Sequence, residues 1–113
     1  MTIINQTQKT IIAQNVKIAQ TLSSRIIGLL NRFSLDENEA LVITQCQSIH
    51  MFFMKFAIDA IFVDKNNVVV GLVENIKPFQ LSPIFFKANY VIEAPVQTIL
   101  RTKTCLGDRI EII

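Results

Sequence analysis

The feature that most constrains the fold is an apolar hairpin pattern over residues 56–75. Over 56–63 the side chains on both alternating faces of an extended chain are apolar, apart from Asp59. The polar run 64–67 then supplies a turn, because its asparagines tolerate a positive φ, and a second apolar segment follows over 68–75. The pattern predicts two paired strands, and it commits the chain to a fold built around a sheet.

Isoleucine, valine and phenylalanine dominate the apolar residues of the rest of the chain, which favours strands. Short apolar segments predict further strands at 2–4, 9–13, 16–20, 40–44, 90–94 and 109–113. We expect the strands at 9–13 and 16–20 to join near Gln14-Asn15. Residues 77–89, which contain two prolines, are expected to form a long irregular segment.

Two segments favour helix instead. Apolar side chains recur with helical spacing between 22 and 33, at Leu22, Ile26, Leu29, Leu30 and Phe33. Pro95 suits the first turn of a short second helix. Together the elements predict an α+β, mainly β fold: a small closed or partly open antiparallel β-barrel, with an amphipathic helix at about 22–33 and a short helix at about 95–102.

The composition excludes several classes of protein. A chain of 113 residues predicts a single domain over 1–113, and its 50% hydrophobic content excludes disorder. No stretch approaches the roughly 20 consecutive apolar residues of a membrane-spanning helix. Two cysteines are too few for a disulfide scaffold, and a net charge of +2 is too small for a nucleic-acid-binding surface. The N-terminus lacks signal-peptide features, so we expect a cytoplasmic protein, with a cleaved secreted form left open.

Four separated motifs resemble those of one protein family. The longest is the run from Cys46 to Asp64, which contains Ser-Ile-His-Met-Phe-Phe-Met-Lys-Phe-Ala-Ile-Asp. The others are Arg25 with Gly28-Leu29-Leu30, Val91-Ile92-Glu93-Ala94-Pro95, and Leu106-Gly107-Asp108-Arg109-Ile110. In order and spacing, over residues 16–112, they resemble the domain of unknown function 192 family of bacteria and archaea. The resemblance implies a small, compact, β-rich domain of uncharacterised activity, and we expect a bacterial chain.

The chain departs from the pattern of that family at three positions. Ala57 stands where the pattern has proline, and Met51 where it often has threonine. Gln97 replaces the glycine that follows the Ala-Pro pair. This last change makes a tight backbone approach at the start of the second helix less expected.

Asp59 is the polar residue that the pattern singles out most clearly. Its same-face neighbours are apolar, so we expect the carboxylate to be at least partly buried and to have a fixed partner. That partner is either a set of backbone N–H groups or one of the side chains Arg25 and His50. Structural polar roles are expected for Arg25, Asp59, Glu93 and Asp108.

Cys46, His50 and Met54 recur at every fourth residue and carry the soft donor atoms that suit Cu(I). In an extended chain, however, these three side chains spread over about 26 Å, which one metal ion does not bridge. We therefore expect no metal and no other cofactor.

Large apolar residues are concentrated in the Phe52–Phe56 region and in residues 79–86. The second of these segments is either a buried lid or an exposed patch that contacts a partner. The candidate contacts are Phe53, Met54, Phe79, Phe85 and Phe86.

Two functions from different classes follow from these candidates. The favoured one is a non-enzymatic binding or accessory protein for a peptide or a small ligand, with an unknown protein or small molecule as partner, no nucleic acid and no membrane span. The alternative is a small enzyme in which Asp59 acts with His50 or Glu93 as an acid/base pair.

Overall fold

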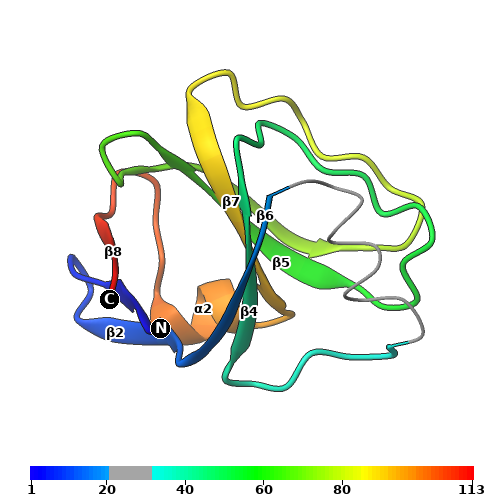
Figure 1. Cartoon of the computed structure of the whole chain (residues 1–113), viewed down its shortest axis with the longest axis horizontal. Helices are drawn as coiled ribbons and strands as arrows, with labels where there is room; N and C mark the ends of the chain where they lie inside the picture. Colours follow the sequence, from blue (N-terminus) through cyan, green and yellow to red (C-terminus); the bar gives the residue numbers. More distant parts are fainter. Residues whose placement is uncertain (21–31) are drawn as a thin grey trace.

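The structure, a computed structural model, describes residues 1–20 and 32–113. Five strands form the larger sheet, in the spatial order β3-β4-β7-β5-β6 (Figure 1). Their bounds are Asn15–Ala19 (β3), Glu39–Thr44 (β4), Ile58–Asp64 (β5), Val69–Ile76 (β6) and Ala88–Pro95 (β7). The β3–β4 pair is parallel, and the other three pairs are antiparallel.

A smaller sheet of three strands lies on the side of the molecule where the two chain ends are found (Figure 1). Its central strand is β1 (Ile3–Asn5), which pairs antiparallel with β2 (Thr10–Ala13) and with β8 (Ile110–Ile112). The short helix α2 (Thr98–Thr102) connects the last strand of the larger sheet to this smaller one.

At the centre of the larger sheet both faces are buried, which explains why β5 is apolar on both of its faces. Ala60 and Phe62 pack into one core cluster, together with Val91. Ile61 and Val63 project from the opposite face into a second cluster, which also includes residues of the smaller sheet. The hairpin predicted for 56–75 is confirmed as β5 and β6.

The predicted mainly β class is confirmed, but the arrangement of the strands differs from the expected antiparallel barrel. The strands predicted at 9–13 and 16–20 are present as β2 and β3, joined at Gln14 as expected. They enter different sheets, because β2 belongs to the smaller sheet and β3 pairs in parallel with β4. The larger sheet is therefore mixed rather than purely antiparallel. The described strands make two separate sheets, and no closed barrel is found among them.

The short second helix is confirmed, although only Thr98–Thr102 is helical within the predicted 95–102. The helix predicted for 22–33 falls outside the described residues, except for its last two positions. In the described part of the chain, no helix has the length and apolar character needed to cross a membrane.

Candidate functional site

Two long loops lie side by side and form what we call the double loop, residues 45–57 and 77–87 (Figure 1). Backbone hydrogen bonds join them along their length: Phe85 N–H donates to the Gln47 carbonyl at 2.8 Å, and Met51 N–H donates to the Gln80 carbonyl at 2.9 Å. Between these points, Ser82 N–H donates to the Ile49 carbonyl at 2.9 Å. The two loops are therefore one ordered unit rather than two independent segments.

At one end of the double loop, two turns meet at a single carbonyl oxygen. The Met51 carbonyl accepts a hydrogen bond from Met54 N–H at 3.3 Å, which closes the first turn, and another from Phe79 N–H at 2.9 Å. The second turn is closed by Gln80 N–H, which donates to the Lys77 carbonyl at 3.1 Å.

Each of these turns places a phenylalanine in the left-handed region of the backbone. Phe53 and Phe79 both have φ of 69°, at the third position of a turn where glycine is usually found. A bulky L-residue costs roughly 1–2 kcal/mol in this conformation. The two side chains are 70% and 72% exposed, so burial of the rings does not offset that cost. Backbone strain of this kind is common at functional sites.

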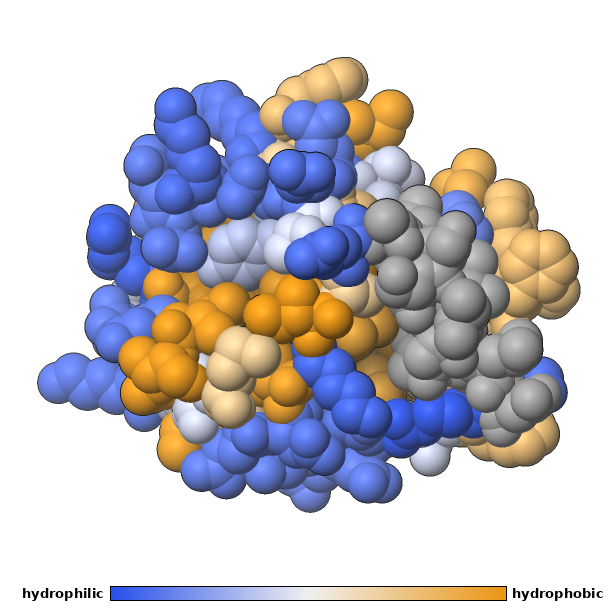
Figure 2. Space-filling model, in the orientation of Figure 1, coloured by the Kyte–Doolittle hydropathy of each residue, from blue (hydrophilic) through white to orange (hydrophobic). Residues whose placement is uncertain are grey.

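Further apolar side chains are exposed along the same double loop. Figure 2 shows apolar side chains at the top and along the right edge of the molecule, where Figure 1 places these loops. The exposed members in the second loop are Phe79, Leu81, Ile84 and Phe86. We call Phe53 and these four residues the apolar stripe. Leu81 and Ile84 were not among the sequence candidates, because nothing in the sequence separates an exposed from a buried side chain in a loop.

The other two candidate contact residues, Met54 and Phe85, face inward. Met54 is buried in the core cluster around Phe62. The Phe85 ring packs at a tilt of 35° against the Phe62 ring, with centroids 4.5 Å apart. It covers Gly71 so closely that a Cβ atom there would lie 2.5 Å from the Phe85 ring. Phe85 is therefore a half-buried cover of the sheet, whereas the adjacent Phe86 is 78% exposed.

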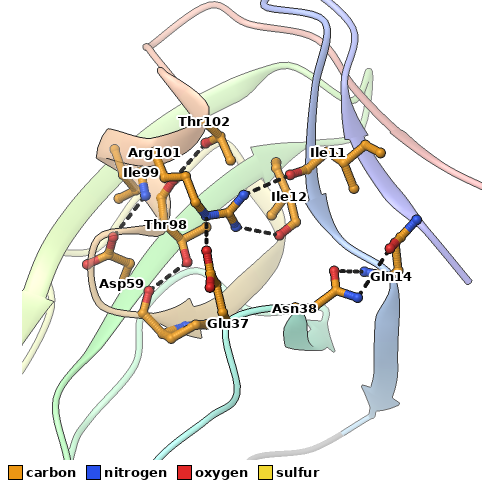
Figure 3. Close-up of polar contacts among 11 residues, drawn as sticks. Ile11, Ile12, Gln14, Glu37, Asn38, Asp59, Thr98, Ile99, Arg101 and Thr102 are labelled. Atoms are coloured by element: carbon orange, nitrogen blue, oxygen red, sulfur yellow. Dashed lines mark hydrogen bonds and ion pairs between the residues drawn. The ribbon is translucent and has the colours of Figure 1, made fainter.

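Asp59 lies under the junction between β6 and α2, where it is 1% exposed. Its Oδ1 accepts a hydrogen bond from Asn75 N–H at 2.9 Å. Its Oδ2 accepts one from Ile99 N–H, also at 2.9 Å (Figure 3). The sequence left two kinds of partner open for Asp59, backbone N–H groups or a side chain. The hydrogen bonds of the structure are to backbone N–H groups. The carboxylate thus links the C-terminal end of β6 to the first turn of α2.

Two residues near this carboxylate have left-handed backbone, which asparagine tolerates and glutamine rarely adopts. Asn75 has φ of 53° and Gln97, directly before α2, has φ of 78°. Three shallow hollows of 240–300 Å³ surround the junction, and Asn75, Pro95, Val96 and Gln97 each line two of them. Gln97 thus occupies a left-handed position that suits the glycine of the family pattern.

α2 is held against the smaller sheet by Arg101. Its guanidinium donates to the carbonyl oxygens of Ile11 and Ile12 at 3.2 and 3.1 Å, and Nε lies 3.8 Å from a carboxylate oxygen of Glu37 (Figure 3). Within the helix, Thr102 Oγ1 donates to the Thr98 carbonyl at 2.8 Å. The position of α2, and with it the Asp59 junction, is therefore fixed from two sides.

Glu93 is fully buried, but it does not meet Asp59. It pairs with Ala60 and Leu41, so its side chain projects from the same sheet face as the Phe62 cluster. Asp59 is one residue from Ala60 along β5 and projects from the opposite face. The sheet thus separates the two carboxylates. His50 lies in the double loop, where it forms an isolated bridge with Leu81.

Asp108 stands at the corner before β8 and is 4% exposed. Its carboxylate accepts hydrogen bonds from the Asn5 amide at 3.0 Å and from Cys105 N–H at 2.8 Å. The Gln8 amide donates to the same group at 3.1 Å. Burial alone raises the pKa of Asp108, but the hydrogen bonds outweigh it and hold the pKa below its ordinary value.

The Asp108→Asn variant is expected to unfold with a free energy about 1–2 kcal/mol lower than wild type at neutral pH. Because the folded-state pKa lies below the unfolded value of about 3.9, the stabilisation by the carboxylate is complete above that value. This stabilisation is lost as the pH falls toward the lowered pKa, so the free energies of unfolding of the two proteins should converge in acid. Urea unfolding of both proteins as a function of pH measures this, and a difference that stays constant into acid would contradict it.

Among the described residues, no cluster of three or more His, Cys, Asp or Glu side chains has the geometry to hold a metal ion. Cys46 Sγ donates to the Ser48 carbonyl at 3.0 Å, and His50 Nδ1 accepts from Phe52 N–H at 3.3 Å. Arg25 lies outside the described residues.

Comparison with known proteins extends the sequence resemblance to nearly the whole chain. The model of the domain of unknown function 192, described as "Uncharacterized ACR", matches residues 2–112. The chain belongs to this family. The activity of the family is uncharacterised, so membership of the family indicates the fold of the chain but no reaction or ligand.

Similar members of the domain of unknown function 192 family come from archaea. A UPF0127 protein of Thermococcus sibiricus is 36% identical, with 96% of this chain and 73% of the relative covered. A UPF0127 protein of Pyrococcus horikoshii is 33% identical, with 96% of each chain covered. These relatives do not support the expectation of a bacterial chain.

A solved structure shares the fold at low sequence identity. A protein of unknown function from Novosphingobium aromaticivorans has a TM-score of 0.81 and 20% identity, with 98% of this chain and 82% of the other covered. A Sinorhizobium meliloti protein, provisionally described as a transcription regulator, has a TM-score of 0.73, also at 20% identity. Such likeness concerns the fold alone.

Proposed function

We propose that this protein is a non-enzymatic binding domain that takes up a peptide on the apolar stripe of the double loop. The observation that carries the proposal is the pair of adjacent turns that hold Phe53 and Phe79 exposed in left-handed backbone. A glycine or an asparagine at either position would relieve the backbone strain. Two exposed aromatic rings at strained positions suit contact residues at an interface, where a few large side chains contribute most of the binding energy.

The rigidity of the double loop supports the same function. The cross-loop hydrogen bonds hold the stripe in place before a partner arrives, and the half-buried Phe85 and the buried Met54 pack the double loop against the core. A preorganised surface loses less conformational entropy on binding than a flexible one. Exposed apolar groups on such a surface are typical of contacts with peptides or proteins.

Support for the acid/base alternative is weaker. Asp59 and Glu93 project from opposite faces of the larger sheet, and both oxygens of Asp59 accept hydrogen bonds from backbone amides. An acid/base pair needs its groups within reach of one substrate proton. The hollow beside Asp59 is lined by Glu74, Asn75, Gln97 and Leu100, so neither His50 nor Glu93 lies in its wall.

The double variant Phe53→Asn/Phe79→Asn tests the proposal because it separates binding from folding. Asparagine tolerates left-handed backbone, so the free energy of unfolding should stay the same or rise by up to about 2 kcal/mol. Binding should weaken at least tenfold, because two central aromatic contacts are lost. The probe is a set of 12-residue peptides selected from a random display library on the wild-type protein, with affinities measured by fluorescence anisotropy.

The matched control is Leu106→Asn/Ile113→Asn, which removes two apolar side chains of similar exposure outside the double loop. We expect this control to bind the selected peptides as wild type does. Equal binding by the Phe53/Phe79 variant would overturn the proposal. A loss of more than about 1 kcal/mol in the free energy of unfolding of that variant would also overturn the proposal, since the two rings would then stabilise the fold rather than bind a partner.

A further inference from the structure

The double loop carries a one-sided charge. Its two segments contain Lys55, Lys77 and Lys87, all exposed, and neither segment contains an aspartate or a glutamate. The lysines flank the apolar stripe along the chain: Lys55 follows Phe53 by two residues, Lys77 precedes Phe79 by two, and Lys87 directly follows Phe86. Lys55 Nζ also lies 5.0 Å from the centroid of the Phe33 ring.

The distribution of acids over the molecule strengthens this local charge. Four of the nine acidic residues are buried: Glu39, Asp59, Glu93 and Asp108. Every lysine and arginine in the described residues is at least partly exposed. Accessible cations therefore outnumber accessible acids by more than the net charge of +2 indicates.

We infer that the partner of the apolar stripe is an acidic peptide segment that also carries apolar side chains. This inference rests on the proposed peptide-binding function and adds the charge of the partner to it. The apolar side chains of the partner would lie on Phe53, Phe79 and Phe86, and its carboxylates would lie next to the three lysines. Complementary charge of this kind speeds association and selects among partners with the same apolar pattern.

The elongated shape of the stripe favours a peptide over a membrane surface. Phe53 and Phe79 lie at the Met51 end of the double loop, whereas Phe86 lies at the other end, where the Gln47 side chain donates to the Phe86 carbonyl at 2.8 Å. The hydrogen-bonded ladder separates the two ends. A single extended chain can follow this path and contact each anchor in turn.

Binding of four synthetic 12-residue peptides tests the inference. Three of them alternate leucine with glutamate, glutamine or lysine, and the fourth alternates serine with glutamate. We expect the Leu/Glu peptide to bind wild type at least tenfold more tightly than the other three. The variant Lys55→Gln/Lys77→Gln/Lys87→Gln should lose about tenfold for this peptide, with a weaker salt dependence. The charge-matched control Lys9→Gln/Lys17→Gln/Lys103→Gln should retain the wild-type affinity.

The remaining outcomes separate failure of the inference from failure of the proposed function. Equal binding of the Leu/Glu and Leu/Gln peptides, lost in the Phe53→Asn/Phe79→Asn variant, would overturn the acidic partner and leave peptide binding in place. Absence of binding by all four peptides and by every library peptide would overturn both. Sedimentation of the protein with phosphatidylglycerol vesicles, without binding of any peptide, would also overturn both and point to an anionic membrane surface.

Discussion

Replacing Asp59 with alanine is expected to lower the free energy of unfolding by about 4 kcal/mol. The carboxylate is the acceptor for two backbone N–H groups, of Asn75 and Ile99, at a position where Asp59 is 1% exposed. Its removal leaves these groups without their acceptor, and each loss costs about 1–3 kcal/mol. The cavity left by the side chain adds to the cost.

The Asp59→Asn variant gives a graded version of the same test, should the alanine variant fail to fold. A carboxamide offers one oxygen in place of two, so one of the two hydrogen bonds is lost and the expected cost is about 2 kcal/mol. Chemical denaturation gives these values, and amide hydrogen exchange should show faster exchange at Asn75 or Ile99. Glu74→Ala is the control, because Glu74 lines the same hollow but is exposed. A loss below about 1 kcal/mol in Asp59→Ala would refute the structural role.

Replacing Gly71 with alanine is expected to cost about 2 kcal/mol, through Phe85. The added Cβ would lie 2.5 Å from the Phe85 ring, so the ring must leave its place over Phe62. The cost approximates the packing energy of a half-buried aromatic side chain, and we expect Phe85→Ala to cost about the same. The double variant should therefore cost about 2 rather than about 4 kcal/mol, because the ring can be displaced only once.

A double-mutant cycle measured by urea unfolding determines this coupling. Phe86→Ala serves as the control, and its stability should lie within about 0.5 kcal/mol of wild type because its side chain is 78% exposed. Additive costs for Gly71→Ala and Phe85→Ala would contradict the close approach. The same cycle assigns roles in the double loop, since Phe85 then belongs to the core and Phe86 to the apolar stripe.

The strands were predictable because their signal is local. The Asp64–Asn67 turn has the positive φ at Asn67 that its sequence favours, and the flanking segments pair as β5 and β6. The sequence does not specify which strands become neighbours. β2 and β3 are separated only by Gln14, yet they enter different sheets, because β3 pairs with β4 in parallel, which no local pattern reports.

The candidate site was predictable in its composition but not in its geometry. The sequence placed large apolar residues in two loops, and it identified Asp59 as a carboxylate that needs a fixed partner. It could not distinguish Phe85 from Phe86, which are adjacent and chemically identical but face opposite ways. The left-handed backbone at Phe53 was equally unpredictable, since phenylalanine has no preference for it. Pro78 did favour a turn at Phe79, because proline suits the second position of such a turn.

The sequence by itself determined the hydrophobic content, the strand segments, the short helix and the kinship with the domain of unknown function 192 family. Only the tertiary structure decided which side chains meet. It joined residues 45–57 to residues 77–87, placed Asp59 and Glu93 on opposite faces of one sheet, and left Phe53 and Phe79 exposed. The physical reason is that periodicity follows from the backbone of each strand, whereas exposure and proximity depend on contacts between segments that are distant in the chain.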